Sequence, residues 1–236
     1  MSDPRIDVVI PVYNCARYLE EAVLSAVCQT LAPARILICD DGSTDETPEI
    51  ARRLSETFPA VEHLRLQHRG VAAARNAGLR VATGDYIAFL DADDVWMPSK
   101  LSAQMDVFAH ADTRVGVVHC GYRLIDHEGG PIEDGYVAEP SKRGNIFRDV
   151  LFEDYAVAGS ASAIVVRRAV FKQVGLFDER LFHGEDADMW LRLAYVSHFD
   201  YVPEPLVALR IHRDSAQRAN ARAKAIDFFM QQLIFY

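Results

Sequence analysis

The sequence predicts an α/β fold, with one mostly parallel central sheet that helices flank on both faces. Short apolar runs of strand length alternate with longer segments of helical periodicity through the first 120 residues. Strand–helix–strand repetition of this kind is typical of parallel sheets. Pairs of aspartates also follow two of the runs, at 40–41 and 93–94. Because ligands bind such sheets at the carboxyl ends of the strands, these aspartates predict the position of a site.

The first half is expected to contain four strands separated by helices. The strands are predicted at residues 6–12, 35–40, 61–66 and 86–90. The helix after the second strand should begin at Ser43, because Ser43 and Glu46 have the spacing of a capping box. A helix rich in small residues is predicted over 70–81, and Pro98 is expected to start the helix after the fourth strand.

The second half is less regular. We expect a strand at 115–121, a polar stretch at 126–144 and a segment of small residues at 156–162 that could admit a ligand. Residues 219–236 have one apolar helical face, and the chain stops within that pattern. This helix either is truncated or docks on the body, on a partner or on a membrane surface.

We therefore expect one domain over residues 1–236. Residues 1–120 would form a nucleotide-type half, residues 121–218 would complete the pocket, and residues 219–236 would follow as the C-terminal helix. The linear order of the elements supports this division, since no linker or internal repeat requires two independent domains.

Composition and charge narrow the possible functions. The 236 residues are 50% hydrophobic and 25% charged, which is ordinary for a soluble globular protein. The formal net charge of −9, without a long basic run, argues against a nucleic-acid partner and against a general affinity for anionic membranes. The four scattered cysteines lack metal-ligand spacing and the N-terminus lacks a secretory signal, which together predict a cytoplasmic protein.

The segment from Tyr86 to Asp94 is the most informative stretch of the chain. Five apolar residues run straight into Asp91, Asp93 and Asp94, so a strand that leaves the core at once presents three carboxylates. Their mutual repulsion is tolerable if a hard cation such as Mg²⁺ or Mn²⁺ binds there. The alternative is an acidic turn that only keeps the strand end in water.

Several motifs in order give the chain a resemblance to a known family. They are Val8-Val9-Ile10-Pro11-Val12-Tyr13-Asn14, Asp40-Asp41-Gly42-Ser43-Thr44-Asp45, Arg75-Asn76-Ala77-Gly78, Leu90-Asp91-Ala92-Asp93-Asp94 and Gly184-Glu185-Asp186-Ala187-Asp188-Met189-Trp190-Leu191-Arg192. This set resembles the family 2 glycosyltransferases of the GT-A fold. The resemblance implies an inverting enzyme that transfers a sugar from a nucleotide-sugar to a hydroxyl group. The second half of the chain would then bind the acceptor.

The resemblance assigns the nucleotide to the first half of the chain. Asp41 is expected to accept a hydrogen bond from the imide nitrogen of uracil or thymine, which implies a UDP- or dTDP-sugar. Pro11, Tyr13 and Asn14 would lie beside the base, with Tyr13 either stacking on it or only covering the core. Arg75 would reach the nucleotide or its diphosphate, or pair with an acidic loop.

The same resemblance assigns a Mn²⁺ or Mg²⁺ cofactor to the acidic segment. Asp93 would bind the metal, with Asp91 near the donor ribose or in the metal shell, and Ala92 would lie between them in the nucleotide site. Asp94 would cap a turn or helix, or take part in the site. His212 would complete the metal shell, contact the diphosphate, or be a structural histidine.

The later acidic motif is where the resemblance implies the reaction. Asp186 would be the general base that deprotonates the attacking hydroxyl, and Glu185 would orient the acceptor or the base. Inversion requires the base on the face opposite the leaving diphosphate, so Asp93 and Asp186 should flank the sugar. The setting that the resemblance implies is polysaccharide or glycolipid assembly. A saccharide or lipid-linked acceptor would be met in the cytoplasm, with peripheral association at the inner face of the cell membrane as an option.

Two other functions are weighed against this one. A sugar nucleotidyltransferase can place a metal-binding aspartate on a similar sheet, but Val12-Tyr13-Asn14-Cys15 stands where it would have a Gly-rich, basic phosphate loop. A catalytically inactive nucleotide-binding scaffold would keep the fold, although the acidic positions here are intact. A Rossmann dehydrogenase is disfavoured further, because no GxGxxG motif follows the first strand.

Overall fold

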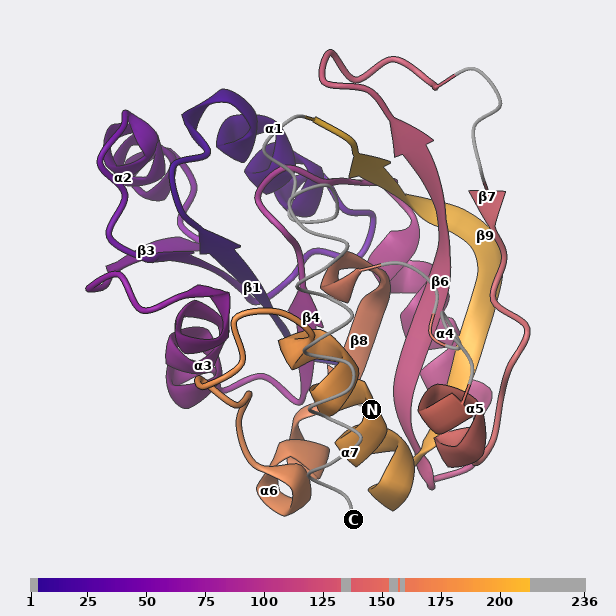
Figure 1. Cartoon of the computed structure of the whole chain (residues 1–236). Helices are drawn as coiled ribbons and strands as arrows, with labels where there is room; N and C mark the ends of the chain where they lie inside the picture. The colour runs from indigo at the N-terminus through magenta and orange to yellow at the C-terminus, as the bar shows by residue number, and fades with distance from the viewer. Residues whose placement is uncertain (1–3, 133–136, 153–156, 158–159, 213–236) are drawn as a thin grey trace.

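The computed structural model describes residues 4–132, 137–152, 157 and 160–212. Within these residues, nine strands form one sheet (Figure 1). The strands are β1 (Ile6–Val12), β2 (Arg35–Asp40), β3 (Val61–Arg65), β4 (Tyr86–Phe89), β5 (Val95–Trp96), β6 (Val115–Ile125), β7 (Val137–Ala138), β8 (Ile164–Arg167) and β9 (His198–Arg210). The helices are α1 (Ala16–Val27), α2 (Thr47–Thr57), α3 (Val71–Val81), α4 (Lys100–His110), α5 (Phe147–Phe152), α6 (Phe171–Val174), α7 (Glu185–Val196) and the 3₁₀ turns η1 (Ala161–Ala163) and η2 (Arg168–Val170). The expected helix at 219–236 lies outside the described residues.

The strands of the first half pair in parallel, as the sequence predicts. β1 lies between β2 and β4, and β3 pairs with the other side of β2. The connections between these strands run through α1, α2 and α3. Every residue of β1 is buried, as expected for a strand that is covered on both faces. The predicted α/β class is confirmed in this half.

The second half extends the same sheet with mixed pairing. β8 runs antiparallel between β4 and β6, and β9 pairs in parallel with β6. β5 pairs antiparallel with β9, and β7 pairs with β6 off the main path. The resulting order is β3-β2-β1-β4-β8-β6-β9-β5. The sheet is therefore continuous from the first half of the chain into the second.

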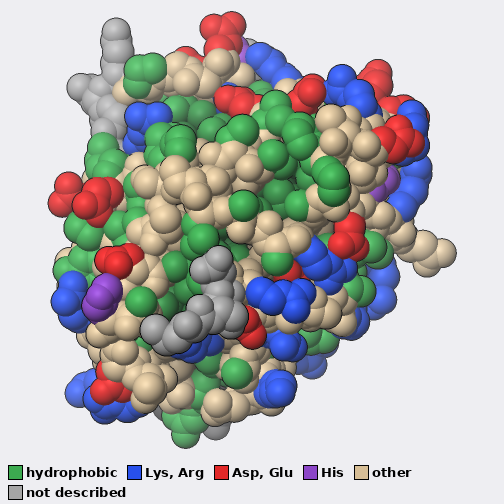
Figure 2. All heavy atoms as spheres, turned by 180° about the vertical axis from the view of Figure 1, so that it is seen from behind, with side chains coloured by type: hydrophobic (Ala, Val, Ile, Leu, Met, Phe, Trp, Pro, Cys, Tyr) green, Lys and Arg blue, Asp and Glu red, His purple; other side chains and the backbone are tan. Residues whose placement is uncertain are grey.

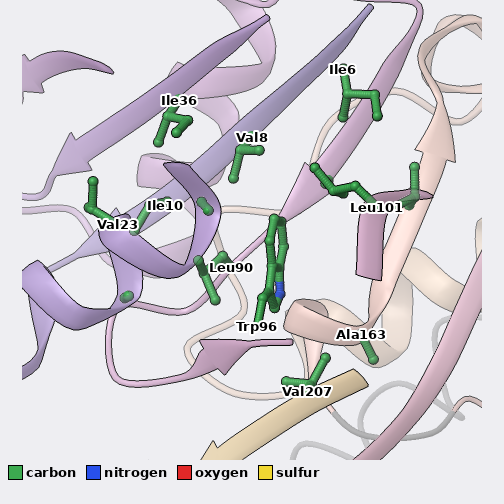
Figure 3. Close-up of a cluster of buried hydrophobic side chains, with 14 of the residues drawn as sticks. Ile6, Val8, Ile10, Val23, Ile36, Leu90, Trp96, Leu101, Ala163 and Val207 are labelled. Carbon is green, nitrogen blue, oxygen red and sulfur yellow. The ribbon is translucent and has the colours of Figure 1, made fainter. Parts of the chain in front are cut away.

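Two hydrophobic clusters cover the two faces of the sheet, because successive side chains of a strand point to opposite sides. Val8 and Ile10 of β1 pack with residues of α1, α2 and α4 on one face. Val9 packs with residues of α3 and α7 on the other face. Figure 3 shows the first cluster, in which Leu90 and Trp96 lie among the strand residues. Helices therefore enclose the central strands from both faces of the sheet.

The start of α2 differs from the predicted capping box. The helix begins at Thr47, and Glu46 precedes it without a side-chain cap. Asp45 takes this role instead, since its Oδ1 accepts a hydrogen bond from the Thr47 backbone N–H at 3.0 Å. The Ser43 hydroxyl accepts a hydrogen bond from the backbone N–H of Asn14 at 3.0 Å. The turn before α2 is thus tied to the end of β1.

One face of the molecule has a surface of mixed character. On the face shown in Figure 2, acidic and basic side chains are interspersed around hydrophobic ones. In the described parts of the chain, no helix has both the length and the apolar composition needed to cross a membrane.

Lys100, the first residue of α4, is a fully buried amine. Its Nζ lies 4.0 Å from the centre of the Trp96 ring, and no described residue accepts a hydrogen bond from it. Burial lowers the pKa of Lys100 to about 7, and the charge of Cys120 opposes this shift. The folded protein therefore releases this proton near pH 7, whereas the unfolded chain keeps it up to the ordinary value of 10.5.

We expect Lys100→Met to have a higher free energy of unfolding than the unmodified chain at pH 7.5. This difference should be smaller at pH 9. Between pH 7 and 10.5 the unfolded chain binds more protons at Lys100, so the free energy of unfolding of the unmodified chain rises with pH, by at most about 1.4 kcal/mol per pH unit. Urea unfolding at the two pH values should show the difference shrinking by up to about 2 kcal/mol. Lys172→Met, at an exposed lysine of α6, is the control. If the difference in free energy of unfolding changes with pH no more for Lys100→Met than for Lys172→Met, the buried amine is not neutral in the folded protein.

Candidate active site

The carboxyl ends of β1, β2 and β4 bring three predicted segments to one edge of the sheet. The strands are adjacent and parallel, with Val12 opposite Asp40 and Val9 opposite Phe89. The predicted site residues Tyr13, Asn14, Asp41 and Asp91 follow directly at this edge. The topology of the sheet therefore fixes where these side chains meet.

Asp41 is buried at the end of β2, where the segment before α3 holds its carboxylate. Its Oδ1 accepts a hydrogen bond from the backbone N–H of Arg69 at 2.9 Å, and its Oδ2 accepts one from Gly70 at 2.8 Å. The Nδ1 atom of His68 also lies 2.8 Å from Oδ2. Asp41 therefore braces the start of α3. A ligand that binds this carboxylate must do so beside Arg69, Gly70 and His68.

Pro11 and Asn14 shape the same corner of the site. Pro11 is a buried residue of β1. Asn14 has a positive φ of 49°, and its Oδ1 accepts a hydrogen bond from the backbone N–H of Thr44 at 2.8 Å. Asp40 closes the turn, because its Oδ1 accepts one from the backbone N–H of Ser43 at 2.8 Å. These contacts hold the turn after β2 against the end of β1.

Tyr13 presents an aromatic ring beside the Asp41 carboxylate. Its side chain is 44% exposed, and its ring stacks on His68 with centroids 4.0 Å apart and an interplanar angle of 20°. His68 is not among the site residues that the sequence predicts. The signal that could have indicated it is its position just after β3, at the same edge of the sheet.

Arg75 of α3 joins the two acidic motifs. Its guanidinium donates hydrogen bonds to Asp91 Oδ1 at 2.8 Å and to Glu185 Oε1 at 2.6 Å. Only 4% of the Arg75 side chain is exposed, and the Phe177 ring lies 5.5 Å from it. Of the alternatives that the sequence leaves open for Arg75, the structure shows pairing with acidic loops. The residue links the loop after β4 to the start of α7.

This bridge also determines the charge states of the groups around it. Burial alone would lower the pKa of Arg75, but the carboxylates of Asp91 and Glu185 reverse that effect and raise it. Burial raises the pKa of Glu185, and the positive charge of Arg75 opposes the shift. A buried guanidinium between two carboxylates is tolerated only while its partners are present.

Asp186 lies in the first turn of α7, directly after Glu185. The chain turns into the helix at Gly184, whose φ of 76° favours glycine. Asp186 is half-buried, and its Oδ1 accepts a hydrogen bond from the backbone N–H of Ala187 at 2.8 Å. The charge of Asp186 contributes to the raised pKa of Arg75. Asp186 therefore lies close enough to the Arg75 bridge for its charge to act on the guanidinium.

Asp93 and His212 are far apart in the sequence but adjacent in the structure. His212 Nε2 lies 3.0 Å from Asp93 Oδ2. Burial and the nearby Asp91 carboxylate raise the pKa of Asp93, and the contact with His212 lowers it. Two carboxylates thus repel each other in one short loop, and a bound cation would relieve that repulsion.

The Asp93–His212 pair can supply two ligands to a divalent cation. A carboxylate and an imidazole suit Mn²⁺, and the carboxylate alone suits Mg²⁺. Asp91 is turned toward Arg75, and the described residues contain no group of three potential metal-ligating side chains. The pair therefore fits a metal that takes its remaining ligands from phosphate or water.

Asp94 and Ala92 are buried in the loop that follows β4, here called the acidic loop (residues 90–94). Asp94 is buried and accepts hydrogen bonds from the Ser162 hydroxyl at 2.6 Å and the Arg210 backbone N–H at 3.1 Å. The Ser162 oxygen also accepts one from the backbone N–H of Asp91 at 2.9 Å. The Ala92 methyl group is buried in the core. The small-residue segment expected to admit a ligand thus braces the acidic loop at Ser162.

A family model described as glycosyl transferase family 2 matches residues 7–175 of this chain. The chain belongs to this family. An uncharacterized glycosyltransferase of Rickettsia prowazekii is 31% identical to it over 226 residues, which cover 95% of this chain and 69% of the relative. Chondroitin synthase of Escherichia coli is 31% identical over 199 residues, which cover 84% of this chain and 28% of the synthase. The enzyme is therefore a glycosyltransferase.

Solved structures confirm the GT-A fold of this glycosyltransferase. Staphylococcus aureus TarS 1–349 in complex with UDP-GlcNAc has a TM-score of 0.74 and 19% identity, covering 98% of this chain and 65% of that one. The mannosyltransferase PcManGT from Pyrobaculum calidifontis, in complex with GDP-Man and Mn²⁺, has a TM-score of 0.73 and 24% identity, covering 99% and 65%. The chain spans about two thirds of each of these structures.

We expect Arg75→Met to lower the free energy of unfolding by about 3–5 kcal/mol, because it leaves the Glu185 carboxylate buried without its cation. Urea unfolding at pH 7 measures the loss. Arg80→Met on the same helix removes an exposed pair with Glu179 and should cost less than about 1 kcal/mol.

The double variant Arg75→Met/Glu185→Gln tests the cause of this loss. It removes the unpaired charge and should recover part of the stability that Arg75→Met loses. Equal losses for Arg75→Met and Arg80→Met would contradict the buried bridge.

Proposed function

We propose that this glycosyltransferase transfers a sugar, with inversion, from a UDP- or dTDP-sugar to a hydroxyl group, and that both halves of the chain act as one catalytic domain. The observation that supports this most is the Arg75 bridge, which joins Asp91 at the sheet edge to Glu185 beside Asp186. The carboxylates proposed to act on the donor and those proposed to act on the acceptor thereby belong to one site, and each has a separate role.

Tyr13 and Asp41 support a uracil or thymine base. A pyrimidine ring can stack on Tyr13, and its imide N–H can donate a charge-assisted hydrogen bond to the carboxylate. The TarS structure contains UDP-GlcNAc, and the PcManGT structure contains GDP-Man. Because the fold serves donors with different bases, competition among UDP, dTDP and GDP is the direct test of this assignment.

Asp186 is assigned as the general base. In a single displacement the acceptor oxygen attacks the anomeric carbon, its proton passes to the Asp186 carboxylate, and the nucleoside diphosphate leaves from the opposite face of the sugar. Glu185 Oε1 accepts a hydrogen bond from the Arg75 guanidinium at 2.6 Å, so we assign Glu185 as a positioning residue for Asp186. The Arg75–Glu185 hydrogen bond thereby holds the first turn of α7, which contains Asp186.

Asp93 and His212 would hold a Mn²⁺ or Mg²⁺ ion at the diphosphate. A divalent cation in this position neutralises charge on the departing diphosphate. The Mn²⁺ in the PcManGT structure supports such a cofactor. Asp91, oriented by Arg75, would lie beside the donor ribose.

The acceptor is proposed to be a saccharide or a lipid-linked sugar. Similarity to chondroitin synthase supports a role in polysaccharide or glycolipid assembly, in the cytoplasm and with peripheral association at the membrane face. A panel of UDP-, dTDP- and GDP-sugars, assayed for nucleotide release with and without Mn²⁺ and with simple saccharide acceptors, tests the proposal. Absence of nucleotide release from every donor would contradict it.

We expect Asp186→Asn to lower saccharide-dependent nucleotide release by about 10²–10⁴-fold, because an amide cannot accept the hydroxyl proton. The dissociation constant for the nucleotide, measured by calorimetry, should stay within about twofold, since Asp186 does not contact the donor base. Asp188→Asn, which removes the pair with Arg192 in the same helix, is the matched control. Full transfer activity in Asp186→Asn would refute the assignment of the base.

We expect Asp93→Asn to abolish the stimulation of nucleotide release by Mn²⁺, because the amide is a much weaker ligand than the carboxylate. Calorimetry should show that UDP binding to this variant no longer depends on Mn²⁺. Asp106→Asn, at an exposed aspartate of α4, should behave like the unmodified enzyme. Undiminished Mn²⁺ stimulation in Asp93→Asn would rule out this aspartate as a ligand.

A further inference from the structure

His68 occupies an unusual position for a half-exposed side chain. Its imidazole lies flat against Tyr13, with ring centroids 4.0 Å apart and an angle of 20° between the planes. Its Nδ1 lies 2.8 Å from Asp41 Oδ2 and 3.1 Å from the Asp41 carbonyl oxygen. Both neighbours of Nδ1 are acceptors, so we assign the ring proton to this nitrogen. The ring therefore stacks on an aromatic residue and directs an N–H group at a buried carboxylate.

These are the two contacts that a pyrimidine base would make in the proposed donor site. A base would stack on Tyr13 and direct its imide N–H at Asp41. The Asp41 side chain is only 4% exposed, and its two oxygens already accept hydrogen bonds from Arg69 and Gly70. Because so little of the carboxylate is exposed, we take the edge that His68 Nδ1 contacts as the one that a base would reach. The imidazole and a base then compete for this edge and for the face of Tyr13 on which the imidazole stacks.

We propose that His68 fills the nucleobase position in the free enzyme and that the donor binds by displacing its imidazole. The inference rests on the proposed function, because it takes Tyr13 and Asp41 as the base site. His68 then acts as an internal competitor for the nucleoside part of the donor. It has no part in binding the diphosphate, which belongs to the Asp93–His212 end of the site.

The local packing allows the ring to leave while the backbone stays. The His68 side chain is 55% exposed, so its side-chain torsions can carry the ring into solvent. The backbone of His68 packs closely against Gly42, since a Cβ atom added to Gly42 would lie 2.9 Å from the backbone nitrogen of His68. Gly42 itself has a φ of 78°. Displacement is therefore a side-chain rotation and leaves the brace between Asp41 and α3 in place.

The expected consequence is a lower apparent affinity for the nucleoside. If the imidazole fills the position for about 70–90% of the time, the apparent dissociation constant is raised about three- to tenfold. Removing the ring should remove this factor for every ligand that contains the base. A ligand without the base should bind as before.

Calorimetric titration of the full chain with UDP, with uridine, and with inorganic pyrophosphate plus Mn²⁺ tests the proposal. His68→Ala should bind UDP and uridine about three- to tenfold more tightly than the unmodified enzyme, with pyrophosphate binding unchanged. His110→Ala is the matched control, because His110 forms an exposed pair with Asp106 on α4 at 3.5 Å. It should leave all three affinities unchanged.

The alternative results separate the inference from the proposed function. Equal or weaker binding of UDP and uridine by His68→Ala would overturn displacement and make the ring a wall of the occupied site, while the proposed function would stand. Failure of both proteins to bind UDP and uridine would overturn the base site itself, and the inference with it.

The unmodified enzyme provides a second measurement that does not depend on a variant. The His68 ring resonances, assigned by their absence from the spectrum of His68→Ala, should carry the ring-current shift of Tyr13. Saturating uridine should move them toward the positions of an unstacked histidine. Resonances that stay in place at saturation would overturn the proposal.

Discussion

The two hydrogen bonds of the buried Arg75 guanidinium are the interaction on which the candidate site depends. Arg75 is fixed in α3, and its two hydrogen bonds reach residues 16 and 110 positions further along the chain. Asp91 lies two residues before Asp93, the proposed metal ligand, and Glu185 lies directly before Asp186, the proposed base. A single charge thus orients both acidic motifs, and the low dielectric of its surroundings makes that orientation rigid.

The strands that the sequence predicts well are those with uninterrupted apolar runs. The bounds predicted for β1 and β2 agree with the structure, because both strands are buried on two faces and their composition shows it. β9 was not predicted, since Pro203 and Pro205 lie within it and proline usually excludes a strand. The pairing with β6 tolerates them through irregular register near Gly121. β8 has only four residues and lacks a periodic signal.

The sequence predicted the positions of several candidate site residues more successfully than it predicted their contacts. Asp41, Asp91 and Asp93 lie where strand ends predict them, because a parallel sheet gathers such ends at one edge. The burial of Asp94 and the orientation of Arg75 depend on residues such as Ser162 and Glu185, which are distant in the sequence. Periodicity and motif spacing contain no information about such pairs. For the same reason His68, whose partners are Tyr13 and Asp41, was not anticipated.

The position of β8 has a consequence for how this fold can diversify. Residues 164–167 lie between β4 and β6, so a strand from the second half is hydrogen-bonded to the strand that leads into the acidic loop. An exchange of second halves between relatives would have to preserve the register of Ile87 with Val166, or the acidic loop would shift with it. Recombination is therefore constrained where β4 pairs with β8. Variation in substrate choice is easier in the connections around it, which can change length without altering the register of the sheet.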